Sequence, residues 1–256
     1  MTALITAYAG LLGLAIGSFL NVVVYRVPRG ESVVNPPSAC PGCGSRIRAR
    51  HNVPVLGWLM LRGSCADCGE PISARYPLVE AATGIAFALT ALRFADDLML
   101  LPAYLAFTAV AIALALIDLD VRRLPDAIVL PAYPAIGALL LLGADGASLL
   151  RAVLGGLALG GFFLAVWFLA PGGMGFGDVK LSGLIGGVTA YLSWGAMLTA
   201  AFLAFILGAL VGVLLLRRGA GRKAAVPFGP FLLLGAYASI LGAAGLGETY
   251  LQMVGF

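Results

Sequence analysis

The stretch Leu181–Leu216, LSGLIGGVTAYLSWGAMLTAAFLAFILGALVGVLLL, runs for 36 residues without a charged side chain. A helix needs roughly 20 apolar residues to cross the hydrocarbon core of a membrane, so this stretch is too long for one span. Aromatic side chains favour the membrane–water interface, and two of them lie in the segment Tyr191–Trp194. We therefore predict two membrane helices in this stretch, with a break near Tyr191–Trp194.

The rest of the chain follows the same pattern. Of its 256 residues, 61% are hydrophobic and 11% are charged, whereas a soluble domain carries roughly 25% charged residues. Charge-poor runs predict six further spans, at Met1–Tyr25, Tyr76–Leu92, Leu98–Ile117, Ala127–Ala144, Ala152–Ala170 and Pro230–Leu246. The predicted fold class is all-α, a polytopic membrane protein with about eight transmembrane helices. Seven is the alternative count, because the sixth span, which begins at Leu181, is short and rich in glycine.

Charge sets the predicted orientation and domain organisation. The chain lacks the basic start and clear cleavage site of a secretory signal, so we expect the first span to be retained. Most of the 16 basic residues fall on one predicted side, and basic residues gather on the cytoplasmic side. The polar segment between the first two spans is then cytoplasmic, and no basic stripe interleaves with aromatics to suggest nucleic-acid binding. We expect three parts: a first helix (1–25), a cytoplasmic loop (26–75) and a seven-helix membrane domain (76–256).

All four cysteines lie in that loop, as Cys40-Pro-Gly-Cys43 and Cys65-Ala-Asp-Cys68. Two CxxC pairs at such a spacing are typical of structural zinc sites, because each turn brings two thiolates to one metal and two turns complete a tetrahedron. A loop this small has little core of its own, and metal binding would supply folding energy. We predict structural zinc held by the four thiolates. The alternatives are two disulfides, which a reducing cytoplasm disfavours, or free thiols.

Two of the twelve acidic residues adjoin predicted spans at the same depth. Asp118 ends the third span, Asp178 opens the sixth, and acids within a membrane are expensive enough to suggest function. Two carboxylates in a low dielectric cannot easily both ionise, so one keeps a proton while the other acts as a base. That pair would activate water against a peptide bond. The alternatives are a helix-capping role, most plausible for Asp178, or a proton relay in a transporter.

Two other acids have simpler interpretations. Asp126 follows Pro125 and is predicted to cap the fourth span. Glu80 lies near the start of the second span, where the helix dipole favours an anion; the alternative is a contact with a substrate amine or the basic loop. His51 is the only histidine, which excludes a HExxH zinc protease. The glycines of 173–177 imitate a nucleotide-binding loop, but no strand precedes them.

Several motifs, in this order, resemble those of the bacterial type IV prepilin peptidases, a family of GxGD-type membrane aspartyl proteases. The resemblance covers almost the whole chain. Its main departure is the basic stretch Val121-Arg122-Arg123, where the family is usually apolar. The motifs are Gly17–Arg26, the paired CxxC turns, Asn52–Pro54, Leu61–Gly63, Arg75–Glu80, Asp118–Asp126, Met174–Lys180 and Pro227–Phe231.

The resemblance implies a substrate and a second activity. Such enzymes cut the leader from prepilins and type II secretion pseudopilins at the cytoplasmic face of the bacterial inner membrane. Many then methylate the new N-terminus with S-adenosylmethionine, usually those with a four-cysteine loop. The catalytic aspartates carry over to Asp118 and Asp178. The alternatives are a peptidase without methyl transfer, a non-enzymatic zinc-loop membrane protein or a proton-coupled transporter.

Overall fold

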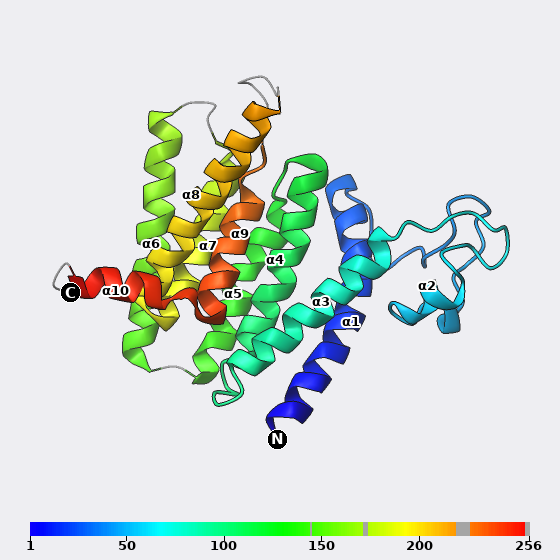
Figure 1. Cartoon of the computed structure of the whole chain (residues 1–256), viewed down its shortest axis with the longest axis horizontal. Coiled ribbons are helices and arrows are strands. Elements are labelled where there is room, and N and C mark those ends of the chain that lie inside the picture. The colour runs from blue at the N-terminus through cyan, green and yellow to red at the C-terminus, as the bar shows by residue number, and fades with distance from the viewer. Residues whose placement is uncertain (144, 171–173, 219–225, 254–256) are drawn as a thin grey trace. The chain divides into compact units, whose positions relative to one another are not determined.

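The computed structural model describes residues 1–143, 145–170, 174–218 and 226–253. Within these ranges the chain is helical, with two isolated β-bridges in the cysteine segment and no strand (Figure 1). The chain divides into two compact units, Met1–Ala113 and Leu114–Phe256. The all-α prediction is confirmed for the described residues.

The N-terminal unit is built on α1 (Thr2–Arg26) and α3 (Arg75–Arg93), which pack together. Small residues let the two backbones touch: a Cβ added at Gly13 would lie 2.8 Å from the Cα of Gly84. Close approach through small residues is the usual way in which membrane helices gain contact. The polar segment between them contains three short helices, η1 (Val27–Arg29), η2 (Ala49–His51) and α2 (Leu56–Met60). The first part of α4 (Leu101–Val121) completes this unit.

The C-terminal unit surrounds α7 (Phe176–Leu192), most of whose residues are buried. This helix contacts α5, α6, α8 and α9, and Figure 1 shows it among these neighbours. The approach of α6 is close, since a Cβ at Gly186 would lie 2.4 Å from the carbonyl oxygen of Gly155. The other elements are α5 (Asp126–Leu140), η3 (Leu141–Gly143), α6 (Gly146–Leu169), α8 (Trp194–Arg217), α9 (Gly229–Ala238), η4 (Ser239–Ala243) and α10 (Gly245–Met253).

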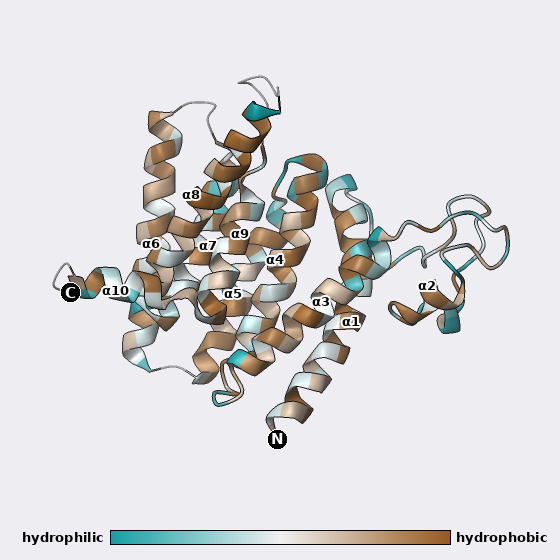
Figure 2. Ribbon diagram, viewed as in Figure 1, coloured by the Kyte–Doolittle hydropathy of each residue, from teal (hydrophilic) through white to brown (hydrophobic). Residues whose placement is uncertain are grey.

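Five helical segments are long and apolar enough to cross a membrane, or six if the bent pair at the C-terminal end is one span. Figure 2 shows hydrophobic residues along most of their length. Neither α3 nor α7 is among them; α7 has only 17 residues. The chain is thus multi-pass, and the count of eight spans stays a prediction. The five segments are Thr2–Arg29, Leu101–Val121, Asp126–Gly143, Gly146–Leu169 and Trp194–Arg217.

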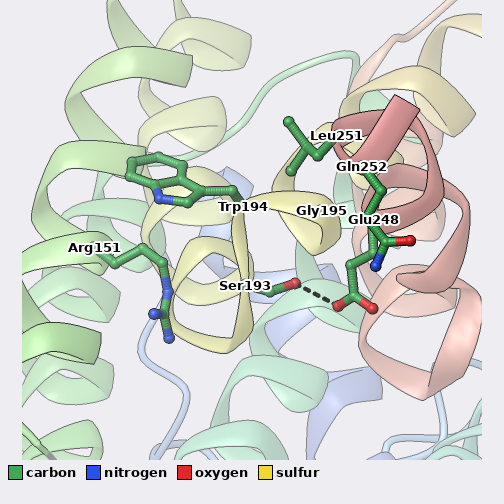
Figure 3. Close-up of a pocket in the computed structure, with 7 residues that line it drawn as sticks. All are labelled: Arg151, Ser193, Trp194, Gly195, Glu248, Leu251 and Gln252. Atoms are coloured by element: carbon green, nitrogen blue, oxygen red, sulfur yellow. Dashed lines mark hydrogen bonds between the residues drawn. The ribbon is translucent and has the colours of Figure 1, made fainter. Parts of the chain in front are cut away.

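The predicted break in the long apolar stretch is confirmed at Ser193, which separates α7 from α8. Its hydroxyl accepts the backbone N–H of Ala196 at 3.0 Å, which caps α8, and donates to Glu248 at 3.0 Å (Figure 3). The neighbouring Arg151 donates from Nε to the carbonyl of Ala190 at 2.6 Å and from Nη2 to that of Tyr191 at 2.5 Å. The guanidinium therefore caps the C-terminal end of α7, far along that helix from Asp178.

The predicted last span, Pro230–Leu246, is not one continuous helix, and it stays a single span only if the bent pair crosses the membrane together. The axis turns by 80° between Gly229–Ala243 and Gly245–Met253. Gly242 adopts φ of +147° inside the π-helical turn η4, a conformation open to glycine because it has no Cβ. The helix therefore breaks near Gly242, although the sequence there stays apolar.

Parts of three predictions lie outside the described residues. Ala144 would end the fourth span, and Gly173 would begin the glycine motif. Arg222 and Lys223 belong to the predicted cytoplasmic charge.

Candidate active site and metal centre

Asp118 lies in the last turn of α4 with 5% of its surface exposed. Its Oδ2 atom is buried and has no hydrogen-bond partner among the described residues. Burying an acceptor without a partner is costly, and the helix C-terminus disfavours a negative charge. A purely structural role explains this placement poorly, so the geometry favours a chemical one.

Asp178 lies in the first turn of α7 with 8% of its surface exposed. The N-cap position of this helix is held by Gly175, without a side-chain cap hydrogen bond. Asp178 is therefore not the N-cap residue, but its carboxyl accepts a hydrogen bond from the backbone of Gly175, so a role in closing the start of α7 stays an alternative. The carboxyl folds back toward the loop instead, since a Cβ at Gly175 would lie 3.6 Å from its Oδ2.

The structure brings the two acids together at the start of α7. Their carboxyl groups are close enough to interact electrostatically, although 59 residues separate them in the sequence. Leu124, from the α4–α5 connection, lies beside both: a Cβ at Gly177 would be 3.0 Å from its Cβ, and one at Gly229 would be 3.5 Å from its Cδ1. The two acids, Gly229 and Leu124 therefore belong to one cluster at the start of α7.

Gly229 is a part of this site that the sequence analysis quoted only within a motif. It begins α9, and a Cβ there would lie 2.6 Å from Oδ2 of Asp118. No side chain fits at this position without moving the acid. The available signal was glycine followed by Pro230, since proline favours the first turn of a helix; nothing in the sequence pointed to the contact with Asp118.

The connection between α4 and α5 corrects one prediction. Asp126 does not cap α5, because Pro125 holds the N-cap position without a side-chain cap bond. Asp126 forms an ion pair with Lys180 of α7 instead. Asp120, two residues after Asp118 on α4, is exposed. Arg122, which is also exposed, adopts φ of +52° and donates its N–H to the carbonyl of Asp118 at 2.9 Å.

Glu80 connects helix α3 to the cysteine segment. It lies on α3 with 9% of its surface exposed, and its Oε2 accepts the backbone N–H of Val55 at 2.6 Å. Val55 has φ of +62°, a conformation that is strained for a β-branched residue. This contact favours a structural role, and a contact between Glu80 and a substrate stays a prediction.

The four cysteine side chains converge on one point in the N-terminal unit. Their Sγ atoms all lie within 4.8 Å of one another, with 3.7 Å between Cys40 and Cys68 and 4.0 Å between Cys43 and Cys65. A tetrahedral zinc ion with bonds of about 2.3 Å needs sulfurs about 3.8 Å apart. All four are free thiols, so the disulfide alternative is wrong. The donor set fits a metal ion.

Two matching turns create this convergence. At the first, Cys40 donates its N–H to the carbonyl of Ser45 at 3.0 Å, and Gly44 donates to Cys40 at 2.9 Å. The same two bonds recur at the Cys65 turn, at 2.8 and 3.0 Å. Gly44 and Gly69 adopt φ of +71° and +76°, a left-handed conformation that glycine adopts at little cost. The loop therefore presents two copies of one ligand turn.

Hydrogen bonds within the turns lower the pKa of two of the four thiols, whereas hydrogen bonds from the other cysteines help to raise the pKa of Cys68 to about 12. Bonds from Ser45 lower the pKa of Cys43 to about 6, and the backbone N–H of Asp67 lowers the pKa of Cys65. The thiolate is the form that binds metals. Asp67 does not join the four ligands; it forms an ion pair with Arg48 at 2.5 Å and so connects the two turns.

The helices and these two sites define a class: a polytopic membrane protein with a pair of buried acids at helix ends and a four-cysteine centre. Residues 11–94 match the Bacterial Peptidase A24 N-terminal domain. Residues 105–213 match the Type IV leader peptidase family. The two matches together cover most of the chain.

Similar proteins extend this match over nearly full length. A relative from Pseudomonas putida is 38% identical over 97% of this chain and 94% of its own. Relatives from Aeromonas hydrophila and Pseudomonas aeruginosa are each 36% identical, over 94% and 96% of this chain and 92% and 93% of their own. All three are named prepilin leader peptidase/N-methyltransferase. No solved structure matches. The chain belongs to the type IV leader peptidase family, which confirms the resemblance that its motifs predict.

Proposed function

We propose that this protein cuts the leader peptide from type IV prepilins and type II secretion pseudopilins, with Asp118 and Asp178 as the catalytic pair. The observation that carries the proposal is the buried, unpartnered oxygen of Asp118 within electrostatic reach of Asp178. The two acids come from the two motifs that resemble those of membrane aspartyl proteases. Relatives that match this chain over nearly all of their own length are named for the same reaction.

The pair would work by moving protons. The ionised carboxyl takes a proton from a water molecule while the water oxygen bonds to the carbonyl carbon of the peptide bond. The protonated carboxyl gives its proton to the carbonyl oxygen. When the C–N bond breaks, the amine leaves with a proton from the pair, and the other product is a carboxylic acid. Gly175, where an added Cβ would lie 3.6 Å from Oδ2 of Asp178, is the glycine that would let a substrate backbone approach this acid.

The variants D118N and D178N test the pair in a prepilin cleavage assay. Each replaces an acid by a group of similar shape that does not exchange the proton, so we expect a loss of at least about 10³-fold. D120N is the matched control, because it removes the same charge from an exposed position on the same helix, and it should cleave at the normal rate. Normal cleavage by D118N or D178N would overturn the proposal.

Methyl transfer is the second activity we propose, with S-adenosylmethionine as the methyl donor. It is supported by the names of the relatives and by the cysteine loop, which accompanies this activity in proteins that this chain resembles. Mass spectrometry of the cleaved pilin should find one added methyl group on the new N-terminal amine. A mature pilin without that group would mean a peptidase alone.

We further propose that the cysteine centre binds structural zinc and faces the cytoplasm of the inner membrane. Four sulfurs leave no open position, as is typical of structural sites, and the basic residues around the loop favour the inner side. Metal analysis should find about one zinc per chain, and none in a C40S/C65S variant. A protease added to inside-out vesicles should cut within 26–75. Equal metal in both proteins, or protection of the loop, would contradict these proposals.

A further inference from the structure

An ion pair joins the two segments that carry the acids. Asp118 and Asp126 flank the α4–α5 connection, and Asp178 and Lys180 share the first turns of α7. The Lys180 ammonium group contacts Oδ1 of Asp126, and the two side chains are 22% and 58% exposed. Each segment therefore supplies one acid to the buried pair and one charge to a link between the segments.

Two further contacts hold the start of α5 against α7. The hydroxyl of Tyr133, about two turns into α5, donates to the backbone carbonyl of Lys180 at 2.5 Å. Leu124 lies against the backbone of Gly177, where a Cβ would be 3.0 Å away. Three contacts therefore join this region to α7: a hydrogen bond, a packing contact and the Asp126–Lys180 ion pair.

Lys180 can affect Asp178 only by fixing the position of the α7 backbone, because the two side chains do not point the same way. Two residues along an α-helix turn the side chain by roughly 200°, so Lys180 and Asp178 point to different faces of α7. Asp178 is buried, while Lys180 reaches Asp126 and also lies 5.4 Å from the centre of the Phe176 ring. The pair can therefore fix where the first turn of α7 lies relative to the end of α4.

We propose that Asp126 and Lys180 form a clasp that sets the spacing of the Asp118 and Asp178 carboxyls, which makes them positioning residues for the reaction. A half-exposed ion pair contributes little to stability, because water screens the two charges. Position is more sensitive, because a displacement of about 1 Å can cost roughly 10²-fold in rate. The clasp therefore affects turnover far more than folding. This inference rests on the proposed peptidase function.

The test measures kcat and KM of prepilin cleavage for K180M and D126N, with D120N as the control. We expect kcat to fall about tenfold while KM and the melting temperature change little. K180R should restore most of the rate, since it can still pair with Asp126. The double variant D126N/K180M should lose no more than either single variant, because both remove the same contact.

The outcomes separate the clasp from the catalytic pair. If D118N and D178N are inactive but K180M and D126N keep normal kcat, the clasp is wrong and the peptidase stands. The clasp would also be wrong if kcat falls only in proportion to the amount of folded protein. If D118N or D178N cleaves normally, the catalytic assignment itself fails.

Discussion

The cysteine centre and the acid pair are assembled in opposite ways. The cysteine centre comes from one continuous segment in which a single turn occurs twice, and each turn is closed by its own backbone hydrogen bonds. The acid pair comes from the end of α4 and the start of α7, and a glycine from α9 lies against it. The first site is local in sequence, and the second depends on how three helices pack.

This difference predicts how each site fails. The cysteine centre should depend on its metal and its turns, because a small polar loop has little core to hold it. The acid pair should depend on volume, because packed groups around Asp118 leave no room for an added methyl group. The predictions that follow use these two dependences, from the largest expected effect to the smallest.

Metal removal should give the largest effect, confined to the cysteine segment. After treatment of the holoenzyme with a chelator, we expect amide hydrogens in residues 38–72 to lose their protection from exchange, because the turns no longer share a metal. Amides of α7 should keep theirs. The C40S/C65S variant should show the same loss without a chelator. Unchanged exchange in both cases would mean that the turns hold themselves together.

A single methyl group at Gly229 should give the next largest effect. In G229A the new Cβ would lie 2.6 Å from Oδ2 of Asp118, so the carboxyl must move, and cleavage should fall roughly 10²-fold. The control is G137A, because a Cβ at Gly137 meets no atom within 4 Å. Equal cleavage rates for G229A and G137A would show that the acid pair tolerates displacement.

The sequence predicts most of the helices, the four cysteines that converge and the two aspartates. It does not predict the residues from other helices that contact them. Charge-free runs locate the helices, and the aromatic residues near Ser193 locate the break between α7 and α8. The convergence of the four cysteines follows from their spacing, because each CxxC turn is formed by neighbouring residues. Asp118 and Asp178 stand out in the sequence because both adjoin predicted membrane spans at the same depth. These features depend on residues close together in the chain.

The contacts between distant segments could not be predicted. Gly229 meets Asp118, and Lys180 pairs with Asp126, only because helices far apart in the sequence pack side by side. One sequence without related sequences gives no signal for such pairs. The bend at Gly242 was also missed, because the apolar pattern continues through it and only the backbone conformation reveals the break.

The turns of the cysteine centre should respond to smaller changes. Gly69 adopts φ of +76° with open space around it, so G69A introduces only backbone strain, about 1–2 kcal/mol. We expect zinc to dissociate from G69A roughly tenfold more readily in a chelator competition. G69N should lie closer to the native protein, because asparagine tolerates this conformation. If G69A and G69N bind zinc equally well, strain at this turn does not limit the site.

The smallest effect should come from a residue that belongs to neither site. Ser193 caps α8 and donates to Glu248, so S193A should lower stability by about 1 kcal/mol, measured as a lower melting temperature. Cleavage should not change. Arg151 separately holds the carbonyls at this end of α7, and Asp178 lies at the other end. S193T keeps the hydroxyl and should melt like the native protein. A loss of cleavage in S193A without loss of folded protein would show that the acid pair is sensitive to the whole length of α7, and would extend its dependence on packing beyond the three helix ends that meet there.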